Sequence, residues 1–107
     1  MKVIEYQRFK DLQHDGVRIL NVLSADAFQK AHIPGSVNMP HDNPHFAEEV
    51  KNAIGSKDVP VIVYCASYSC DASMKAARKL DNEGFSNVMC YEGGTKEWQE
   101  KASARAA

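Results

Sequence analysis

Two cysteines flank a short polar segment near the middle of the chain. Cys65 directly follows the apolar run Val61–Tyr64, and Cys70 comes five residues later, just before an alanine-rich segment. A thiolate is a strong nucleophile, and the carboxyl end of a buried parallel strand is where substrates meet an α/β sheet. The pattern therefore indicates thiol chemistry at Cys65, with a second thiol close by in the chain.

Composition and charge narrow the class of protein. The 107 residues suffice for one domain, expected over residues 1–107, and 44% hydrophobic with 25% charged residues is typical of a soluble globular protein. A net charge of −1 gives no electrostatic reason to expect nucleic acid or a membrane surface as partner. No apolar run approaches the roughly 18 residues of a membrane span, and the N-terminus has no apolar signal core. We expect a cytoplasmic protein, either a monomer or a weak homodimer.

Strand and helix patterns alternate along the sequence. Strands are predicted at residues 3–4, 18–23, 36–39, 61–64 and 86–91, and helices at residues 6–13, 25–32, 44–54 and 71–83 and around Trp98. The run at residues 61–64 is apolar without alternation, which is typical of a central strand buried on both faces. The order predicts an α/β fold with a mostly parallel sheet, and it places Cys65 at the carboxyl end of the central strand.

The segment after Cys65 can influence its thiol. Its small residues allow a tight curl that aims backbone N–H groups inward, and the helix predicted from Asp71 adds the positive end of its dipole. Both effects favour a thiolate. The alternative is that Cys65 is a buried strand-end residue without chemistry, as many free cysteines are.

Three segments carry a family resemblance. HIPGSVNMP, residues 32–40, resembles the HIPGA-x-N-x-P signature of rhodanese-like domains; VIVYC with the loop and alanine-rich helix after it resembles their active-site strand and loop; and YEGGTKEW, residues 91–98, resembles their closing LEGG-x-x-x-W signature. The resemblance implies a three-layer sandwich in which helices flank a five-stranded, mostly parallel sheet. It also implies a sulfurtransferase that carries sulfane sulfur as a persulfide on Cys65 and passes it to a thiol or to cyanide, without a metal or an organic cofactor.

The loop itself is the predicted substrate-binding element. The backbone amides expected to line it belong to Ala66, Ser67, Tyr68, Ser69, Cys70 and Asp71. Related phosphatases use a loop one residue longer that ends in arginine, whereas that position here is Asp71, whose carboxylate would repel a phosphate. Many rhodanese-like loops carry arginine where this chain has Ala66 and Cys70. We therefore expect a small-molecule or protein persulfide as donor rather than the dianion thiosulfate.

Cys70 has more than one interpretation. It is either a resolving thiol that attacks the Cys65 persulfide, releasing sulfide or taking over the sulfur, or simply a small residue at a helix start. Metal binding by the pair is a weaker interpretation, because Cys90, predicted to be in the core, is the only other cysteine. At the level of function, the alternatives are a non-catalytic module that binds a protein partner, and a Cys65/Cys70 thiol–disulfide switch. His41 and His45 are interpreted as solvated loop residues.

Overall fold

The computed structural model describes residues 1–106, which form strands and helices in strict alternation. In chain order the elements are β1 (Lys2–Ile4), α1 (Tyr6–His14), β2 (Arg18–Asn21), α2 (Ala25–Lys30), β3 (Val37–Asn38), α3 (Phe46–Ile54), β4 (Val61–Tyr64), α4 (Ala72–Asn82), β5 (Val88–Tyr91) and α5 (Gly94–Ala106). None of the helices within residues 1–106 combines the length and the apolar character that a membrane span requires.

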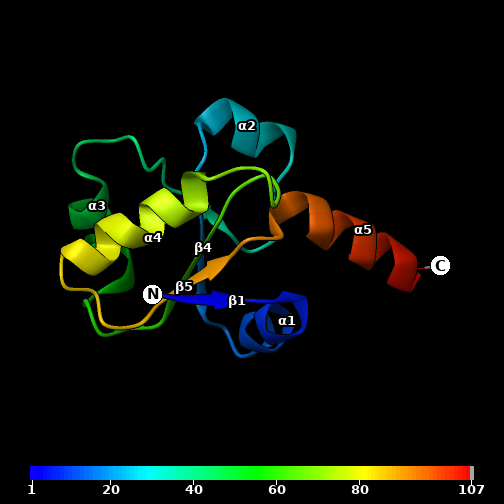
Figure 1. Ribbon diagram of the computed structural model, residues 1–107, viewed down its shortest axis with the longest axis horizontal. Coiled ribbons are helices and arrows are strands. Elements are labelled where there is room, and N and C mark those ends of the chain that lie inside the picture. The colour runs from blue at the N-terminus through cyan, green and yellow to red at the C-terminus, as the bar shows by residue number, and fades with distance from the viewer. Residues whose placement is uncertain (107) are drawn as a thin grey trace.

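The strands form one five-stranded sheet in the order β1-β5-β4-β2-β3 (Figure 1). Every strand pair is parallel, so the sheet is wholly rather than mostly parallel. β4 lies in the middle, and all four of its residues are buried, as its unbroken apolar run predicts. The carboxyl ends of all five strands therefore lie along one edge of the sheet, and Cys65 leaves β4 at that edge.

Hydrophobic cores lie on both faces of the sheet, which confirms the predicted three-layer α/β sandwich. On one face, side chains of α3 and α4 pack against Val61 and Val63 of β4, together with Cys65 and Cys90. On the other face, α1 packs against the two alternate residues of β4, Ile62 and Tyr64. Because successive strand residues point to opposite faces, Cys65 belongs to the α3–α4 side.

Some predicted elements are longer than the observed ones. β2 ends at Asn21 rather than at residue 23, because the Asn21 side-chain oxygen accepts a hydrogen bond from the Leu23 amide at 3.0 Å and turns the chain. β3 is reduced to two residues, and α2 ends at Lys30. The predicted cap of α2 is confirmed, since the Ser24 hydroxyl accepts from the Ala27 amide.

The HIPGS turn is tied to the end of β4. The Tyr64 hydroxyl accepts a hydrogen bond from the Ile33 amide at 2.9 Å and lies 2.7 Å from the Ser36 hydroxyl. Gly35 has φ +85°, a conformation that favours glycine at this turn. These contacts fix the residue that immediately precedes Cys65.

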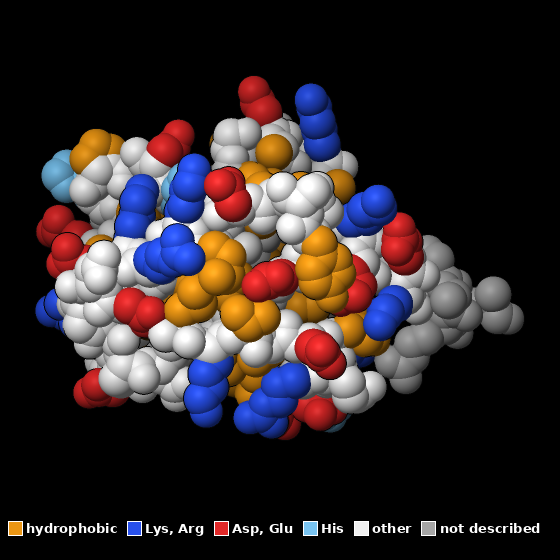
Figure 2. All heavy atoms as spheres, viewed as in Figure 1, with side chains coloured by type: hydrophobic (Ala, Val, Ile, Leu, Met, Phe, Trp, Pro, Cys, Tyr) orange, Lys and Arg blue, Asp and Glu red, His pale blue; other side chains and the backbone are white. Residues whose placement is uncertain are grey.

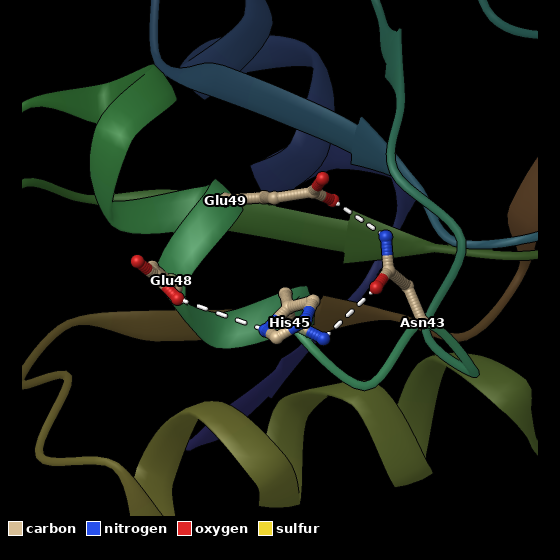
Figure 3. Close-up of polar contacts among 4 residues, drawn as sticks. All are labelled: Asn43, His45, Glu48 and Glu49. Carbon is tan, nitrogen blue, oxygen red and sulfur yellow. Dashed lines mark hydrogen bonds and ion pairs between the residues drawn. The ribbon is translucent and has the colours of Figure 1, made fainter.

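The start of α3 is organised by local side-chain contacts (Figure 3). The Asn43 side chain accepts from the His45 amide at 2.9 Å and donates to Glu49 at 2.8 Å, while the exposed His45 ring lies 3.8 Å from Glu48. This turn occupies the backbone before Phe46, so the helix begins two residues later than predicted. The contacts assign His45 to the exposed start of a helix, as its interpretation as a solvated loop residue requires.

Candidate active site

Cys65 lies at the centre of the sheet's carboxyl edge. It follows β4 directly, between the ends of β5 and β2, and it is fully buried. The chain then makes a tight turn in which the Cys70 amide donates to the Ser67 carbonyl at 3.0 Å, and α4 begins at Ala72. The turn brings Cys70 back over Cys65, because the Cys65 Sγ donates to the Cys70 carbonyl at 3.4 Å.

The start of α5 holds the backbone of this loop. Backbone amides of Thr95 and Lys96 donate to the carbonyls of Cys65 and Ala66 at 3.0 and 2.9 Å. Gly94 allows this approach, because a Cβ there would lie 2.3 Å from the Cys65 carbonyl oxygen, and its φ is +64°. The Gly-Gly motif thus positions the loop after Cys65 from a distant part of the sequence.

The tip of the loop also contacts α5. The exposed Tyr68 donates through its hydroxyl to one Glu97 oxygen at 3.0 Å, and the buried Tyr91 donates to the other at 2.8 Å. A hollow of about 350 Å³ lies beside this contact. It is lined by Ser67, Tyr68, Ser69, Gly93, Lys96, Glu97, Glu100 and Lys101. Cys65 does not line this hollow, so the loop separates its thiol from that surface.

The Cys65 thiol contacts protein groups rather than solvent. Besides the Cys70 carbonyl, its Sγ donates to the Ser73 hydroxyl at 3.4 Å. Burial raises the pKa of Cys65, and contact with the Cys70 thiol raises it further, whereas the hydroxyl and the backbone amide of Ser73 act to lower it. The amides and helix dipole expected from the sequence would instead lower the pKa of Cys65. The direction is opposite because the closed loop removes water from the thiol.

Cys70 shows the opposite behaviour. Its partial burial acts to raise its pKa, but the Cys65 thiol and the backbone amides of Ala72 and Ala66 together lower it. One of the inward-pointing amides expected around Cys65, that of Ala66, thus favours the thiolate of Cys70 instead. The structure brings the two cysteines together. The more exposed of them, Cys70, has the lower pKa.

These features agree with a comparison to known protein families. The rhodanese-like domain family matches residues 5–101. The chain belongs to the rhodanese-like family. The match includes the HIPGS turn, the Cys65 loop and the Gly-Gly motif, which are the three segments that the sequence analysis singled out.

Relatives of the rhodanese-like chain cover most of its length. A protein of Pseudomonas savastanoi pv. phaseolicola named thiosulfate sulfurtransferase GlpE is 34% identical over 98 residues, which cover 92% of this chain and 87% of the relative. Among solved structures, a Bacillus halodurans protein superposes with a TM-score of 0.81 at 24% identity, covering 94% and 73% of the two chains. The human single-domain sulfurtransferase TSTD1 gives 0.79 at 18% identity, covering 94% and 97%. The two structures support the fold.

Charge at the site differs from what an anion-binding loop would need. Residues 66–70 contain no lysine or arginine, and Asp71 follows them. Lys75 lies 3.4 Å from the Asp71 carboxylate, but both side chains are largely exposed, which makes this a weak surface pair. On the face shown in Figure 2, acidic and basic side chains are interspersed around a group of hydrophobic ones, without a field of one sign.

One further residue at the site, Ser73, is not indicated by the sequence, and the core residue Cys90 lies closer to Cys65 than the sequence indicates. Ser73 is fully buried in the first turn of α4, and its hydroxyl accepts from both Cys65 and Cys90, the latter at 3.3 Å. Cys90 is in the core, as predicted. Its closeness to Cys65 follows from the β4–β5 register, which pairs Val63 with Cys90. Across residues 1–106 no three His, Cys, Asp or Glu side chains gather where a metal ion could be held.

His41 lies nearer to the loop than its interpretation as a solvated residue suggests. It is partly buried, and its Nδ1 has no hydrogen-bond partner among the described residues. Burial lowers its pKa most, and the positive charge of Lys79 lowers it further. At the start of α4, Lys75 has a smaller lowering effect and Asp71 a smaller raising effect. His41 is therefore held against α4, where the Lys79 ammonium donates to the His41 carbonyl, and its Nδ1 makes no hydrogen bond to either loop thiol.

Proposed function

We propose that this chain is a sulfurtransferase that carries sulfane sulfur as a persulfide on Cys65. The observation that carries the proposal is the place of the thiol. Cys65 lies at the carboxyl end of the central strand, within contact of the Ser73 hydroxyl, in a chain of the rhodanese-like family. The name of the GlpE relatives, thiosulfate sulfurtransferase, supports the same reaction class.

The chemistry proceeds in two transfers. The Cys65 thiolate attacks the sulfane sulfur of a donor, the donor's remaining sulfur leaves with the electron pair of the broken bond, and Cys65 becomes a persulfide. An acceptor thiol or cyanide then attacks the outer sulfur and restores the Cys65 thiolate. Neither transfer changes the net oxidation state of the protein, so this chemistry needs no metal or organic cofactor.

The closed loop places a condition on the first transfer. Cys65 is fully buried and its pKa is raised, so the loop must move off the thiol before a donor can reach it. Opening admits water, which removes the largest cause of the raised pKa. Ser73 then remains as the group that favours the thiolate, since it acts from α4 rather than from the loop.

The uncharged loop favours a donor without a strong anionic group. Thiosulfate is a dianion, and the nearest loop residues offer it no guanidinium or ammonium group. We infer that the donor is a small-molecule or protein persulfide, that the acceptor is a thiol, and that the protein works as a single domain in the cytoplasm.

Intact-mass measurement tests the proposal directly. Cys70→Ser protein, in which the neighbouring thiol cannot react, is treated with glutathione persulfide and freed of small thiols. We expect one adduct of about 32 Da, a single sulfur atom, located on Cys65 by peptide mapping. Cys90→Ser in the same background is the matched control and should load equally. An adduct of equal yield after Cys65→Ser, or none at all on Cys70→Ser, would overturn the assignment.

A further inference from the structure

Cys65 and Cys70 are in direct contact, although four residues separate them. The tight turn closed by the Ser67 carbonyl folds the loop back, and the Cys65 Sγ lies 3.4 Å from the Cys70 carbonyl oxygen. The two thiols also influence each other, because Cys70 acts to raise the pKa of Cys65 and Cys65 acts to lower the pKa of Cys70. The atom of Cys65 that meets Cys70 is therefore Sγ, which becomes the inner sulfur once a persulfide has formed.

The two thiols have different environments. Cys65 is fully buried, whereas Cys70 is partly exposed. Although partial burial opposes it, the Cys65 thiol and the amides of Ala72 and Ala66 lower the pKa of Cys70. Cys70 thus has a partly exposed thiol of lowered pKa, in a residue whose backbone carbonyl contacts the sulfur that the thiol would attack.

We propose that Cys70 is a second catalytic thiol, which attacks the inner sulfur of the Cys65 persulfide, releases sulfide and leaves a Cys65–Cys70 disulfide. This inference rests on the proposed function, because it needs a persulfide on Cys65. It adds an activity that simple sulfur transfer lacks: the reduction of sulfane sulfur to sulfide within one chain.

The step balances without a further reactant. The Cys70 thiolate forms a bond to Cys65 Sγ, the bond from Sγ to the outer sulfur breaks, and that sulfur departs with the electron pair as hydrosulfide. The outer sulfur gains two electrons, and the two cysteine sulfurs lose one each as they form the disulfide. A second turnover requires a thiol reductant, either a protein dithiol or two low-molecular-weight thiols, to reopen the disulfide.

A single-turnover experiment tests the inference. Wild-type protein, Cys70→Ser and Cys90→Ser are each loaded with one equivalent of glutathione persulfide, freed of small thiols, and followed by intact mass, non-reducing peptide mapping and sulfide measurement. Wild type and Cys90→Ser should lose the added sulfur and release one sulfide per chain. Each should end about 2 Da lighter than the protein before loading, with Cys65 bridged to Cys70. Cys70→Ser should keep its Cys65 persulfide at least about tenfold longer, because no second thiol faces it.

The outcomes separate the two proposals. If Cys70→Ser loads on Cys65 but wild type keeps its persulfide equally long, Cys70 is a bystander and only this inference fails. The inference also fails if the added sulfur moves to Cys70 and no disulfide forms. If Cys70→Ser does not load at all, the proposed function fails and the inference with it. Cys70→Ala, which carries no hydroxyl, repeats the measurement should the serine disturb folding.

Discussion

Ser73 is the residue whose removal tests the electrostatics of the site most sharply. Its hydroxyl is fully buried, 3.4 Å from the Cys65 Sγ, and it acts to lower the pKa of Cys65. Ser73→Ala removes the hydroxyl but keeps the backbone amide and the helix. We expect slower loading of Cys65 with persulfide at neutral pH, because a smaller fraction of its thiol is ionised.

The size of the effect follows from the hydrogen bond that is lost. A hydrogen bond to a charged group contributes roughly 1.5–3 kcal/mol, and sulfur is a weak acceptor, so the lower end applies. Because about 1.4 kcal/mol corresponds to a factor of ten, the thiolate population below the pKa should fall about tenfold. The loss of a buried hydroxyl should also lower the free energy of unfolding by about 1 kcal/mol, which a folded domain tolerates.

The assay is the rate of persulfide loading across pH, measured in the Cys70→Ser background. Loading should rise with pH in both proteins, since the thiolate is the attacking form, but the Ser73→Ala profile should lie at higher pH. The two rates should converge once the pH exceeds the pKa of Cys65 in both. Cys90→Ala is the matched control: it removes the other thiol bonded to the Ser73 hydroxyl, at 3.3 Å, yet leaves the contact with Cys65 intact.

Two results would refute this reasoning. One is equal loading of Ser73→Ala and its parent at every pH, which would mean that the hydroxyl does not act on the reacting thiol. The other is an equal loss in Cys90→Ala, which would show that general loosening of the core, and not the hydrogen bond to Cys65, slows the reaction. Denaturant unfolding of all the variants confirms that the rates are compared between folded proteins.

Three further perturbations address the donor, the loop and the strand end. Thiosulfate turnover should be at least about tenfold slower than persulfide turnover. Asp71→Arg should raise thiosulfate turnover, because it adds a bidentate cation at an exposed position. Efficient thiosulfate turnover in the unmodified protein would contradict the charge argument. Gly94→Ala should sharply lower activity, because its Cβ would lie 2.3 Å from the Cys65 carbonyl oxygen. The control Gly84→Ala has open space around it and should cost only the strain of its positive φ. Equal activity losses in the two variants would refute the steric account. Tyr64→Phe should reduce the unfolding free energy by about 1–3 kcal/mol, measured in urea, since it leaves a buried backbone amide without its acceptor; an unchanged midpoint would show that water replaces the hydroxyl.

The sequence by itself predicted the architecture and the place of Cys65 in it. The unbroken apolar run of β4 required a central strand, the alternation of strands and helices required parallel crossovers, and Cys65 at the end of β4 followed from both. These are local signals, because strand periodicity, helix caps and glycine turns depend on neighbours within a few residues. Two of the boundaries that differed, at β2 and α3, lie where the side chains of Asn21 and Asn43 bond to nearby backbone.

Only the tertiary structure decided how the thiols behave. The parallel pairing of β4 with β5 brings Cys90 beside Cys65, and α4 places Ser73 between them, so the three groups meet although nothing in their spacing along the chain indicates it. The direction of the pKa of Cys65 depends on the closed loop, because burial outweighs the Ser73 amide and hydroxyl that favour its thiolate. The lowered pKa of Cys70 likewise depends on the fold, because the Cys65 thiol and the backbone amides of Ala72 and Ala66 outweigh the effect of its partial burial. The burial of a thiol and the direction of nearby amides both depend on contacts between segments that are distant in the sequence. For that physical reason they exist only in the folded chain.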